Sequence, residues 1–364
     1  MKITFLLPHI RISGGVKALL EYANRLQNMG HLVRVFIPKK IPRWYRLDQW
    51  LKACQNPKLP ETLPPETVNW TNNSLNIEVF PETKSFYIPD ADIIIASAWE
   101  TAEFAAGLPP CKGKPFYFVQ HYESLWTRDK AKAVKTYDLP MQILTISTWL
   151  KNILKEKHAQ SAELLVTPVD RDVFFCKEKI WNLPRRICML HHDYDWKGYT
   201  DGIESIRKVR AQGKNIELVV FGEKIKNPEP LFKSAGFSFE YHYRPSPKQL
   251  RKIYASCDIY LCPSWYEGLG MPAMEAMACK TALITADTGG CHDYAINGKT
   301  ALVSPTQDVE SLTMNLTRLI DNESLLKSIS ENGYQKISEF TWQKNCSQLQ
   351  DIFQSALIKK EYIT

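Results

Sequence analysis

Two glutamates, Glu267 and Glu275, stand eight positions apart, and the residues between them are apolar or glycine, with no lysine, arginine or histidine. Carboxylates pair well with vicinal hydroxyl groups, because each carboxylate oxygen accepts a separate O–H. We therefore expect hydroxyl groups such as those of a sugar, and not cations, as the partners of these two side chains. The alternative is a pair of solvated surface charges.

The residues between the two glutamates also offer backbone donors. A strand is expected to end near Pro263 and a helix to begin near Met271 or Pro272; proline suits the first helical turn, where its missing N–H is not needed. Backbone N–H groups at a helix N-terminus attract anions. The donors of this row are Gly268, Leu269, Gly270 and Met271.

Two further candidates follow other apolar runs. Gly14 and Gly15 open the first helical pattern and would let a diphosphate approach the backbone closely, although a simple tight turn explains the same residues. His121 stands beside Gln120 at the end of a later run; the alternative is a histidine packed in the core. No GxGxxG with a ribose-binding acid is present, which argues against a nicotinamide dehydrogenase.

Composition narrows the class of protein. The chain has 364 residues, a length typical of two domains. Nine cysteines without a CxxC pair argue against a disulfide framework and a structural zinc site, and favour a reducing cytoplasm. No apolar run approaches the roughly 18–20 residues of a membrane span, and the N-terminal run is too short for a signal peptide. The net charge of +7 suits an anionic partner or reflects solvated surface charge, but no motif indicates nucleic acid.

The elements that must position these residues alternate between strand and helix, which predicts an α/β protein with parallel sheets covered on both faces. The strands are expected at residues 2–8, 31–38, 91–98, 114–121, 142–149, 185–192, 216–223, 257–265 and 281–287. The helices are expected at residues 16–30, 101–108, 147–159, 199–213, 246–257, 270–280 and 341–362.

Two domains follow from this pattern. We expect an N-terminal Rossmann-like domain over residues 1–167 and a C-terminal Rossmann-like domain over residues 168–340. A linker rich in proline and charge lies near residues 168–185. The final helical pattern, in residues 341–364, is expected to cross back to the N-terminal domain. Ligands are expected at the carboxyl ends of the strands, where open parallel sheets bind them.

The sequence resembles glycosyltransferase family 4, a group of retaining, nucleotide-sugar-dependent transferases with the GT-B fold. Glu267, seven intervening residues and Glu275 look like the family's EX7E signature. The resemblance covers nearly the whole chain, in order. The other segments that carry it are SGGVKALLEYANRLQNMGHLVRVF, DRDVF, WKGYTDGIESI and TGGCHDYAINGKTALV.

The resemblance implies a role for each candidate. Glu275 would hold the ribose of the donor and Glu267 would contact the donor sugar, with backbone groups of 268–271 on hydroxyls and phosphates. Lys197 looks like the family's diphosphate lysine, and Gly14 and Gly15 would face the diphosphate or the acceptor. His121 looks like the histidine that borders the sugar and its C6 hydroxyl.

One position departs from the family. An arginine usually stands five residues before the lysine, and this chain has His192 there. A charged histidine could still donate to phosphate, so we expect donor affinity to fall as pH rises past its pKa. The surrounding run His191 to Asp195 also offers imidazoles and carboxylates to a metal. We favour a metal-free site, because in the resembled enzymes a lysine and helix dipoles supply the positive charge that a metal ion would otherwise supply.

The resemblance implies a retaining transfer of a hexose, with glucose and a UDP-sugar as best guesses, to an acceptor hydroxyl in polysaccharide or glycolipid synthesis. No cofactor or metal is expected; the partners are the nucleotide-sugar donor and a glycan or lipid-linked acceptor. Residues 38–58 mix basic and aromatic side chains, which suits contact with an anionic membrane at the inner face of the cell membrane, an aromatic shelf for a glycan, or an ordinary surface helix. Two alternatives stand: a GT-B-fold sugar-nucleotide epimerase and a catalytically silent nucleotide-binding subunit.

Overall fold

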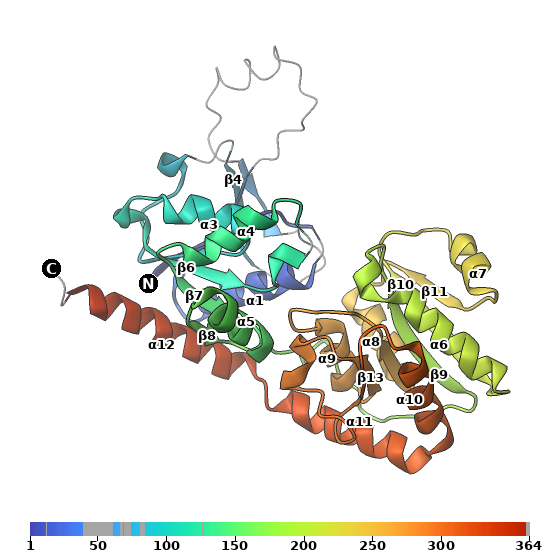
Figure 1. Ribbon diagram of the computed structural model, residues 1–364. Helices are drawn as coiled ribbons and strands as arrows, with labels where there is room; N and C mark the ends of the chain where they lie inside the picture. Colours follow the sequence, from blue (N-terminus) through green and yellow to red (C-terminus); the bar gives the residue numbers. More distant parts are fainter. Residues whose placement is uncertain are drawn as a thin grey trace. The chain divides into compact units, whose positions relative to one another are not determined.

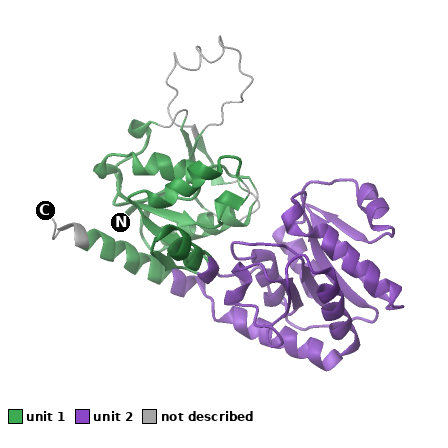
Figure 2. Ribbon diagram, in the orientation of Figure 1, with its two compact units in different colours: residues 1–146, 150–165, 346–364 green, residues 147–149, 166–345 purple. Residues whose placement is uncertain are grey.

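The computed structural model describes residues 1–11, 13–38, 61–65, 68, 74–80, 84–125 and 127–361 (Figure 1). The chain divides into two compact units (Figure 2). Unit 1 contains residues 1–146, 150–165 and 346–364, and unit 2 contains residues 147–149 and 166–345. The units thus divide at 165/166 and 345/346, within a few residues of the 167/168 and 340/341 boundaries expected from the sequence.

Unit 1 is built on a mostly parallel sheet with the order β3-β4-β2-β1-β5-β6-β7-β8, in which β3 runs antiparallel to β4. Its strands are β1 (Lys2–Leu6), β2 (Leu32–Pro38), β3 (Glu61–Leu63), β4 (Ile77–Phe80), β5 (Ile93–Ala96), β6 (Lys114–Val119), β7 (Gln142–Thr145) and β8 (Ala162–Leu164). Its helices are α1 (Gly14–Asn28), α3 (Trp99–Ala106), α4 (Lys130–Lys135), α5 (Thr148–His158), which begins at the edge of unit 2, and most of α12 (Trp342–Glu361).

Unit 2 is a parallel sheet with the order β11-β10-β9-β12-β13-β14. Its strands are β9 (Arg185–His191), β10 (Ile216–Gly222), β11 (Glu240–Tyr243), β12 (Ile259–Cys262), β13 (Ala282–Ala286) and β14 (Leu302–Ser304). Its helices are α6 (Tyr199–Ala211), α7 (Glu229–Ala235), α8 (Pro247–Ser256), α9 (Met271–Ala278), α10 (Val309–Asp321) and α11 (Glu323–Ser338). The strand order therefore reverses direction between β9 and β12, which makes the carboxyl ends of these two strands the expected ligand position.

Local sequence explains the elements. Central strands are uninterrupted apolar runs, as expected for a sheet covered on both faces: every residue of β5, β12 and β13 is buried. Several helices begin with side-chain caps. At the start of α8, the Ser246 hydroxyl accepts the backbone N–H of Gln249, and the Gln249 side chain accepts the backbone N–H of Ser246. At the start of α10, the Asp308 carboxylate accepts the backbone N–H of Ser311. Buried side chains of α6, α10 and α11 form one core cluster with the strands of unit 2.

The expected strands and helices lie where the sequence predicted them, and the fold class is confirmed. Most have shorter bounds, whereas α1 and α3 begin and end two residues earlier than expected. The sequence did not predict the short strands β3, β4, β8, β11 and β14 or helices α4, α7, α10 and α11. Each of these five strands has only three or four residues, and β11 is polar and only partly buried, so they carry little hydrophobic pattern. Residues 39–58, which hold nearly all of the segment proposed for membrane contact, lie outside the described residues.

Candidate functional site

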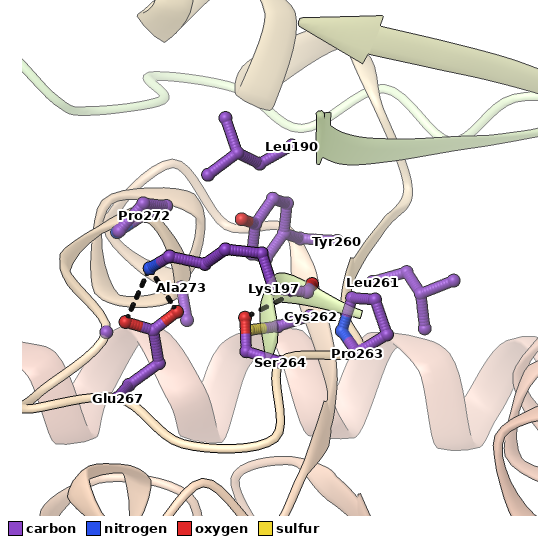
Figure 3. A pocket seen from close by; sticks show the side chains of 11 residues that line it. Leu190, Lys197, Tyr260, Leu261, Cys262, Pro263, Ser264, Glu267, Pro272 and Ala273 are labelled. Atoms are coloured by element: carbon purple, nitrogen blue, oxygen red, sulfur yellow. Dashed lines mark hydrogen bonds and ion pairs between the residues drawn. The ribbon is translucent and has the colours of Figure 1, made fainter. Parts of the chain in front are cut away.

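A pocket lies in unit 2 at the carboxyl ends of β9 and β12, where the strand order reverses (Figure 3). Its walls come from the two strand ends, from the turn after β9 and from the start of α9. It is lined by Leu190, Lys197, Tyr260, Leu261, Cys262, Pro263, Ser264, Glu267, Gly270, Pro272 and Ala273. The position is the one that open α/β sheets use for ligands, and it brings together residues about 70 positions apart in the sequence.

An ion pair between Lys197 and Glu267 crosses this pocket (Figure 3). The ammonium Nζ of Lys197 lies 2.7 Å from Oε1 and 2.9 Å from Oε2 of Glu267. Both side chains are largely covered, at 20% and 12% exposure. The expectation that hydroxyl groups and not cations would face both glutamates is therefore wrong for Glu267, because the lysine arrives from a distant loop that no local window of sequence reveals.

The two loops that carry this pair also make other contacts with each other. The backbone N–H of Trp265 donates to the carbonyl of Trp196 at 2.7 Å. The rings of Trp196 and Tyr266 stack with centroids 5.8 Å apart and an angle of 16°. Gly198, directly after the lysine, has φ +63° and lies so close to the β12 end that a Cβ atom would be 2.0 Å from the carbonyl oxygen of Pro263. Only glycine allows this approach, which fixes the start of α6 and the position of Lys197.

The row of backbone donors precedes α9 as expected, and a hydrogen bond from a buried tyrosine holds its backbone in place. The buried hydroxyl of Tyr294 donates to the carbonyls of Leu269 at 2.9 Å and Gly270 at 3.4 Å. Gly270 adopts φ +88°, and a Cβ there would lie 2.6 Å from the Tyr294 hydroxyl. Pro272 has no N–H, and the N–H of Ala273 donates to the carbonyl of Gly270 at 3.0 Å, so the N–H groups that an anion could meet at this helix start are those of the row before Pro272.

Glu275 lies one turn into α9 and is only 6% exposed. The hydroxyl of Tyr254, from α8, donates to its Oε2 at 3.5 Å. Burial raises the pKa of Tyr254 well above its ordinary value, and the nearby Glu275 raises it further, so the phenol keeps its proton and acts as a donor. Glu275 is not among the residues that line the pocket, although Pro272 and Ala273 of the same helix are. Its carboxylate can accept hydroxyl hydrogens from a ligand that reaches this helix.

His192 follows β9 and is partly buried. Its Nδ1 accepts the backbone N–H of Tyr194 at 3.1 Å, and its ring packs on that of Tyr194 with centroids 4.4 Å apart. Burial lowers the pKa of His192, and the positive charge of Lys197 lowers it further, against the opposing effect of Glu223. The imidazole is therefore neutral at neutral pH and offers a phosphate only its Nε2–H. A charge-assisted hydrogen bond from His192 to a phosphate is expected only in acidic solution.

The other residues of this turn occupy different surroundings. His191 ends β9 as a buried side chain, and its ring packs edge-on against that of Tyr199, with the ring centroids 4.6 Å apart. Asp193 and Asp195 are exposed. Tyr194 continues the ring stack, 4.2 Å from Trp196.

Unit 1 brings its own candidates together at the carboxyl ends of β1 and β6. Gly14 and Gly15 begin α1, capped by Ser13, whose hydroxyl accepts the N–H of Val16 at 3.2 Å. A Cβ on Gly15 would lie 3.2 Å from the side chain of Gln120, the residue before His121. The glycine turn and the histidine loop are therefore neighbours within this unit.

Glu123 is a buried carboxyl group in the same loop, and sequence reasoning missed it as a candidate. Its Oε2 accepts the backbone N–H of Trp99 at the start of α3 at 3.0 Å, and Tyr117 donates to its Oε1 at 3.3 Å. Burial raises the pKa of Glu123 to about 8. Its place two residues after His121 was the only sequence signal. Glu123 thus ties the histidine loop to α3.

None of the helices in the described part of the chain is long and apolar enough to cross a bilayer.

Comparison with known families connects this geometry to sugar transfer. Residues 170–336, which carry the pocket of unit 2, match the family model described as glycosyl transferases group 1. This segment is therefore similar to the group 1 glycosyltransferases. Lys197, Glu267 and Glu275 all lie within the matched segment, whereas the candidates of unit 1 lie outside it.

Curated relatives agree with this similarity. The chain is 28% identical over 228 residues to an MMP alpha-(1->4)-mannosyltransferase of Mycolicibacterium hassiacum, covering 60% of this chain and 55% of that protein. It is 24% identical over 172 residues to the capsular polysaccharide biosynthesis glycosyltransferase CapM of Staphylococcus aureus, covering 45% and 44%. The matches span about half the length of these curated relatives.

Solved structures extend the likeness to the whole chain. Sucrose-phosphate synthase from Thermosynechococcus elongatus superposes with a TM-score of 0.75 at 15% identity, covering 98% of this chain and 99% of that one. HepE of Anabaena, solved in complex with UDP-glucose, gives a TM-score of 0.74 at 14% identity, covering 98% and 100%. At this identity the likeness shows the fold, which is GT-B, with two Rossmann-like units.

Proposed function

We propose that the protein transfers a hexose, with glucose as the best candidate, from a UDP-sugar to an acceptor hydroxyl in polysaccharide or glycolipid synthesis. The observation that carries the proposal is the pocket at the strand-order reversal of unit 2, with Lys197 and Glu267 across it and Glu275 buried one turn into α9. A cation, two carboxylates and a helix N-terminus are the groups that a diphosphate linked to a ribose and a sugar requires.

Each group has a place in this scheme. Lys197 would bind the diphosphate and offset the negative charge that develops on the leaving nucleoside diphosphate. The N–H groups of Gly268 to Met271 would donate to phosphate and sugar oxygens, and Glu275 would accept the ribose hydroxyls. Glu267 would accept sugar hydroxyls once the diphosphate has drawn Lys197 away from it.

The transfer is proposed to retain anomeric configuration by a front-face route. The bond between the anomeric carbon and the leaving phosphate oxygen breaks first, and an oxocarbenium-like centre forms. The acceptor oxygen then bonds to the anomeric carbon from the face that the phosphate leaves, and the leaving phosphate oxygen accepts the proton of the acceptor hydroxyl. A covalent glycosyl intermediate would need a carboxylate poised as a nucleophile. Glu267 is assigned an electrostatic and positioning role instead, in which it accepts sugar hydroxyls of the bound donor. No metal enters this scheme, because Lys197 and the helix N-terminus supply the positive field.

The comparisons support the donor and the setting by analogy. HepE was solved with UDP-glucose, which motivates the choice of donor. CapM is named for capsular polysaccharide biosynthesis, which motivates the choice of a glycan or a lipid-linked glycan as acceptor. The relatives named here are transferases, which favours transfer over the epimerase and the silent subunit.

Calorimetric titration of the full chain with UDP, GDP and ADP in the presence of EDTA tests the proposal. We expect one diphosphate to bind, and Glu275→Ala and Lys197→Met each to weaken that binding. Turnover of the matching sugar nucleotide with candidate acceptors would then identify the sugar. Failure of all three diphosphates to bind would contradict the proposed donor site, and conversion of the donor to a rearranged sugar without acceptor would identify an epimerase.

A further inference from the structure

A second cluster of ligating side chains lies in the turn that follows β13, outside the lining of the donor pocket. Asp287, Cys291 and His292 offer a carboxylate oxygen, a thiol sulfur and an imidazole nitrogen, all within 4.8 Å of one another. None of the three lines the pocket at the β9 and β12 ends. The three donors are of three chemical kinds, so the cluster is not a simple group of surface acids.

The local fold brings these donors together. The chain leaves β13 at Ala286 and turns into the short 3₁₀ helix Gly290–Asp293, which places Cys291 and His292 back beside Asp287. The Nε2 of His292 lies 2.5 Å from Oδ1 of Asp287, and both side chains are about half exposed, at 54% and 50%. The Sγ of Cys291 is buried below them, 3.7 Å from the carbonyl oxygen of Ala286.

A further polar atom lies in the same turn. The hydroxyl of Thr288 is buried beside the Cys291 thiol and makes a hydrogen bond with it that favours the thiolate form, although burial still raises the pKa of this thiol. The thiolate is the form of cysteine that binds a metal.

We propose that Asp287, Cys291 and His292 form a binding site for one divalent transition-metal ion, with Zn²⁺ as the best match. Thiolate and imidazole donors favour Zn²⁺, whereas Mg²⁺ and Ca²⁺ prefer oxygen donors alone. Tetrahedral Zn²⁺ at its usual bond lengths separates ligand atoms by roughly 3.3–3.7 Å. The aspartate and histidine therefore need to move apart, and toward the sulfur, by roughly 1 Å, which their exposed side chains can do.

Binding involves one proton. The Cys291 thiol gives its proton to solvent as the sulfur–metal bond forms, and the neutral imidazole and the carboxylate bind without loss of a proton. Three protein ligands leave a fourth position for water. The spacing Asp-x₃-Cys-His matches no common zinc motif, which is why cysteine spacing alone argued against a zinc site.

A metal at this site would stabilise the turn after β13, which supports the loop that carries Glu267. The carbonyl of Thr288, inside the turn, accepts the backbone N–H of Glu267 at 3.0 Å. A metal bound to both ends of the turn holds Thr288 in place and thereby supports the loop of Glu267. The ion takes no part in sugar transfer, and the inference does not depend on the proposed function.

Titration of untagged, metal-stripped full chain with Co²⁺, and separately with Zn²⁺, tests the proposal. We expect one Co²⁺ per chain with a thiolate-to-cobalt charge-transfer band, displaced by Zn²⁺, and a rise in the thermal midpoint on adding Zn²⁺. Cys291→Ser should lose the band and the rise. Cys279→Ser, which removes another buried thiol of unit 2, is the matched control and should keep both.

Two variants at exposed positions guard against loss of the fold in Cys291→Ser. His292→Gln and Asp287→Asn should each weaken Co²⁺ binding by more than about tenfold with unchanged far-ultraviolet circular dichroism. Three results would each overturn the proposal: no Co²⁺ bound by the wild type, binding without a thiolate band, or a band that survives in Cys291→Ser.

Discussion

The Lys197–Glu267 ion pair leads to an unusual expectation: Glu267→Gln should bind a nucleoside diphosphate more tightly than the wild type while transferring sugar more slowly. In the structure the ammonium is held by both oxygens of Glu267, at 2.7 and 2.9 Å. A diphosphate must replace that carboxylate to engage Lys197. Glutamine keeps the shape of glutamate but removes the charge, so the lysine becomes available and the repulsion between carboxylate and diphosphate disappears.

The expected size of this effect follows from the burial of the pair. Fully exposed ion pairs contribute about 0–1 kcal/mol, and breaking a fully buried pair costs about 3–5 kcal/mol. Lys197 and Glu267 are 20% and 12% exposed, and the lysine keeps contact with solvent, so we take about 1–2 kcal/mol. Since about 1.4 kcal/mol is a tenfold change, UDP should bind about five- to twenty-five-fold more tightly. Turnover should fall, because the sugar loses a carboxylate acceptor.

Calorimetry on four proteins separates two causes of tighter UDP binding: the release of Lys197 and the removal of the Glu267 charge. The proteins are wild type, Glu267→Gln, Lys197→Met and the double variant, each titrated with UDP at low and moderate salt. We expect the gain of Glu267→Gln to vanish in the Lys197→Met background, because no lysine remains to be released. UDP binding that is unchanged or weaker in Glu267→Gln would refute this reasoning. A gain that persists without the lysine would assign the effect to the carboxylate charge alone.

Three further predictions concern other residues. Glu275→Ala should weaken UDP binding about ten- to a hundredfold in calorimetry, because hydrogen bonds to a charged group contribute about 1.5–3 kcal/mol; unchanged affinity would argue against contact with the ribose. Gly198→Ala should lower the free energy of unfolding, measured in urea, by at least about 2 kcal/mol, because the new Cβ would clash with the Pro263 carbonyl. Gly213→Ala is the control: Gly213 also has a positive φ but lies in open space, so this change should cost about 1 kcal/mol. Equal losses in the two variants would contradict the steric argument. Burial raises the pKa of Glu123 from 4.5 to about 8, so the folded protein holds a proton that the unfolded chain releases, and wild-type stability should fall as pH rises between these values by up to about 1.4 kcal/mol per pH unit. Glu123→Gln lacks this loss, so its urea midpoint relative to wild type should increase from about pH 5.5 to about pH 7.5, and a constant difference would show that the carboxyl is ionised when folded.

The sequence predicted the parts of the fold that rest on local patterns. Uninterrupted apolar runs such as Ile93–Ala96 identified the central strands, because a strand covered on both faces needs apolar residues at every position. The alternation of strand and helix predicted the parallel sheets, and the strand ends predicted where the polar residues gather. The glycine-rich approach to α9 was predicted as well, since Gly270 and Pro272 are typical of that helix start.

Features that depend on contacts between residues far apart in the chain could not be predicted from the sequence. Lys197 and Glu267 are joined across loops that no local pattern connects, so the charge balance of the pocket was misjudged. The burial of Glu123 depends on α3 and on Tyr117, and a single glutamate in a polar loop gives no sign of it. The lowered pKa of His192 likewise depends on its fold neighbours, with burial as the main cause.

The contacts between the turn after β9 and the loop before α9 affect which substitutions the protein can tolerate. Trp196 and Tyr266 stack directly beside the ion pair of Lys197 and Glu267, so each loop carries one ring and one charge that the other requires. A substitution in either loop therefore changes the value of substitutions in the other, and such neighbouring effects are not additive. Variation in this lineage should occur in matched pairs across the two loops, and a library that randomises only one of them will sample mostly impaired combinations.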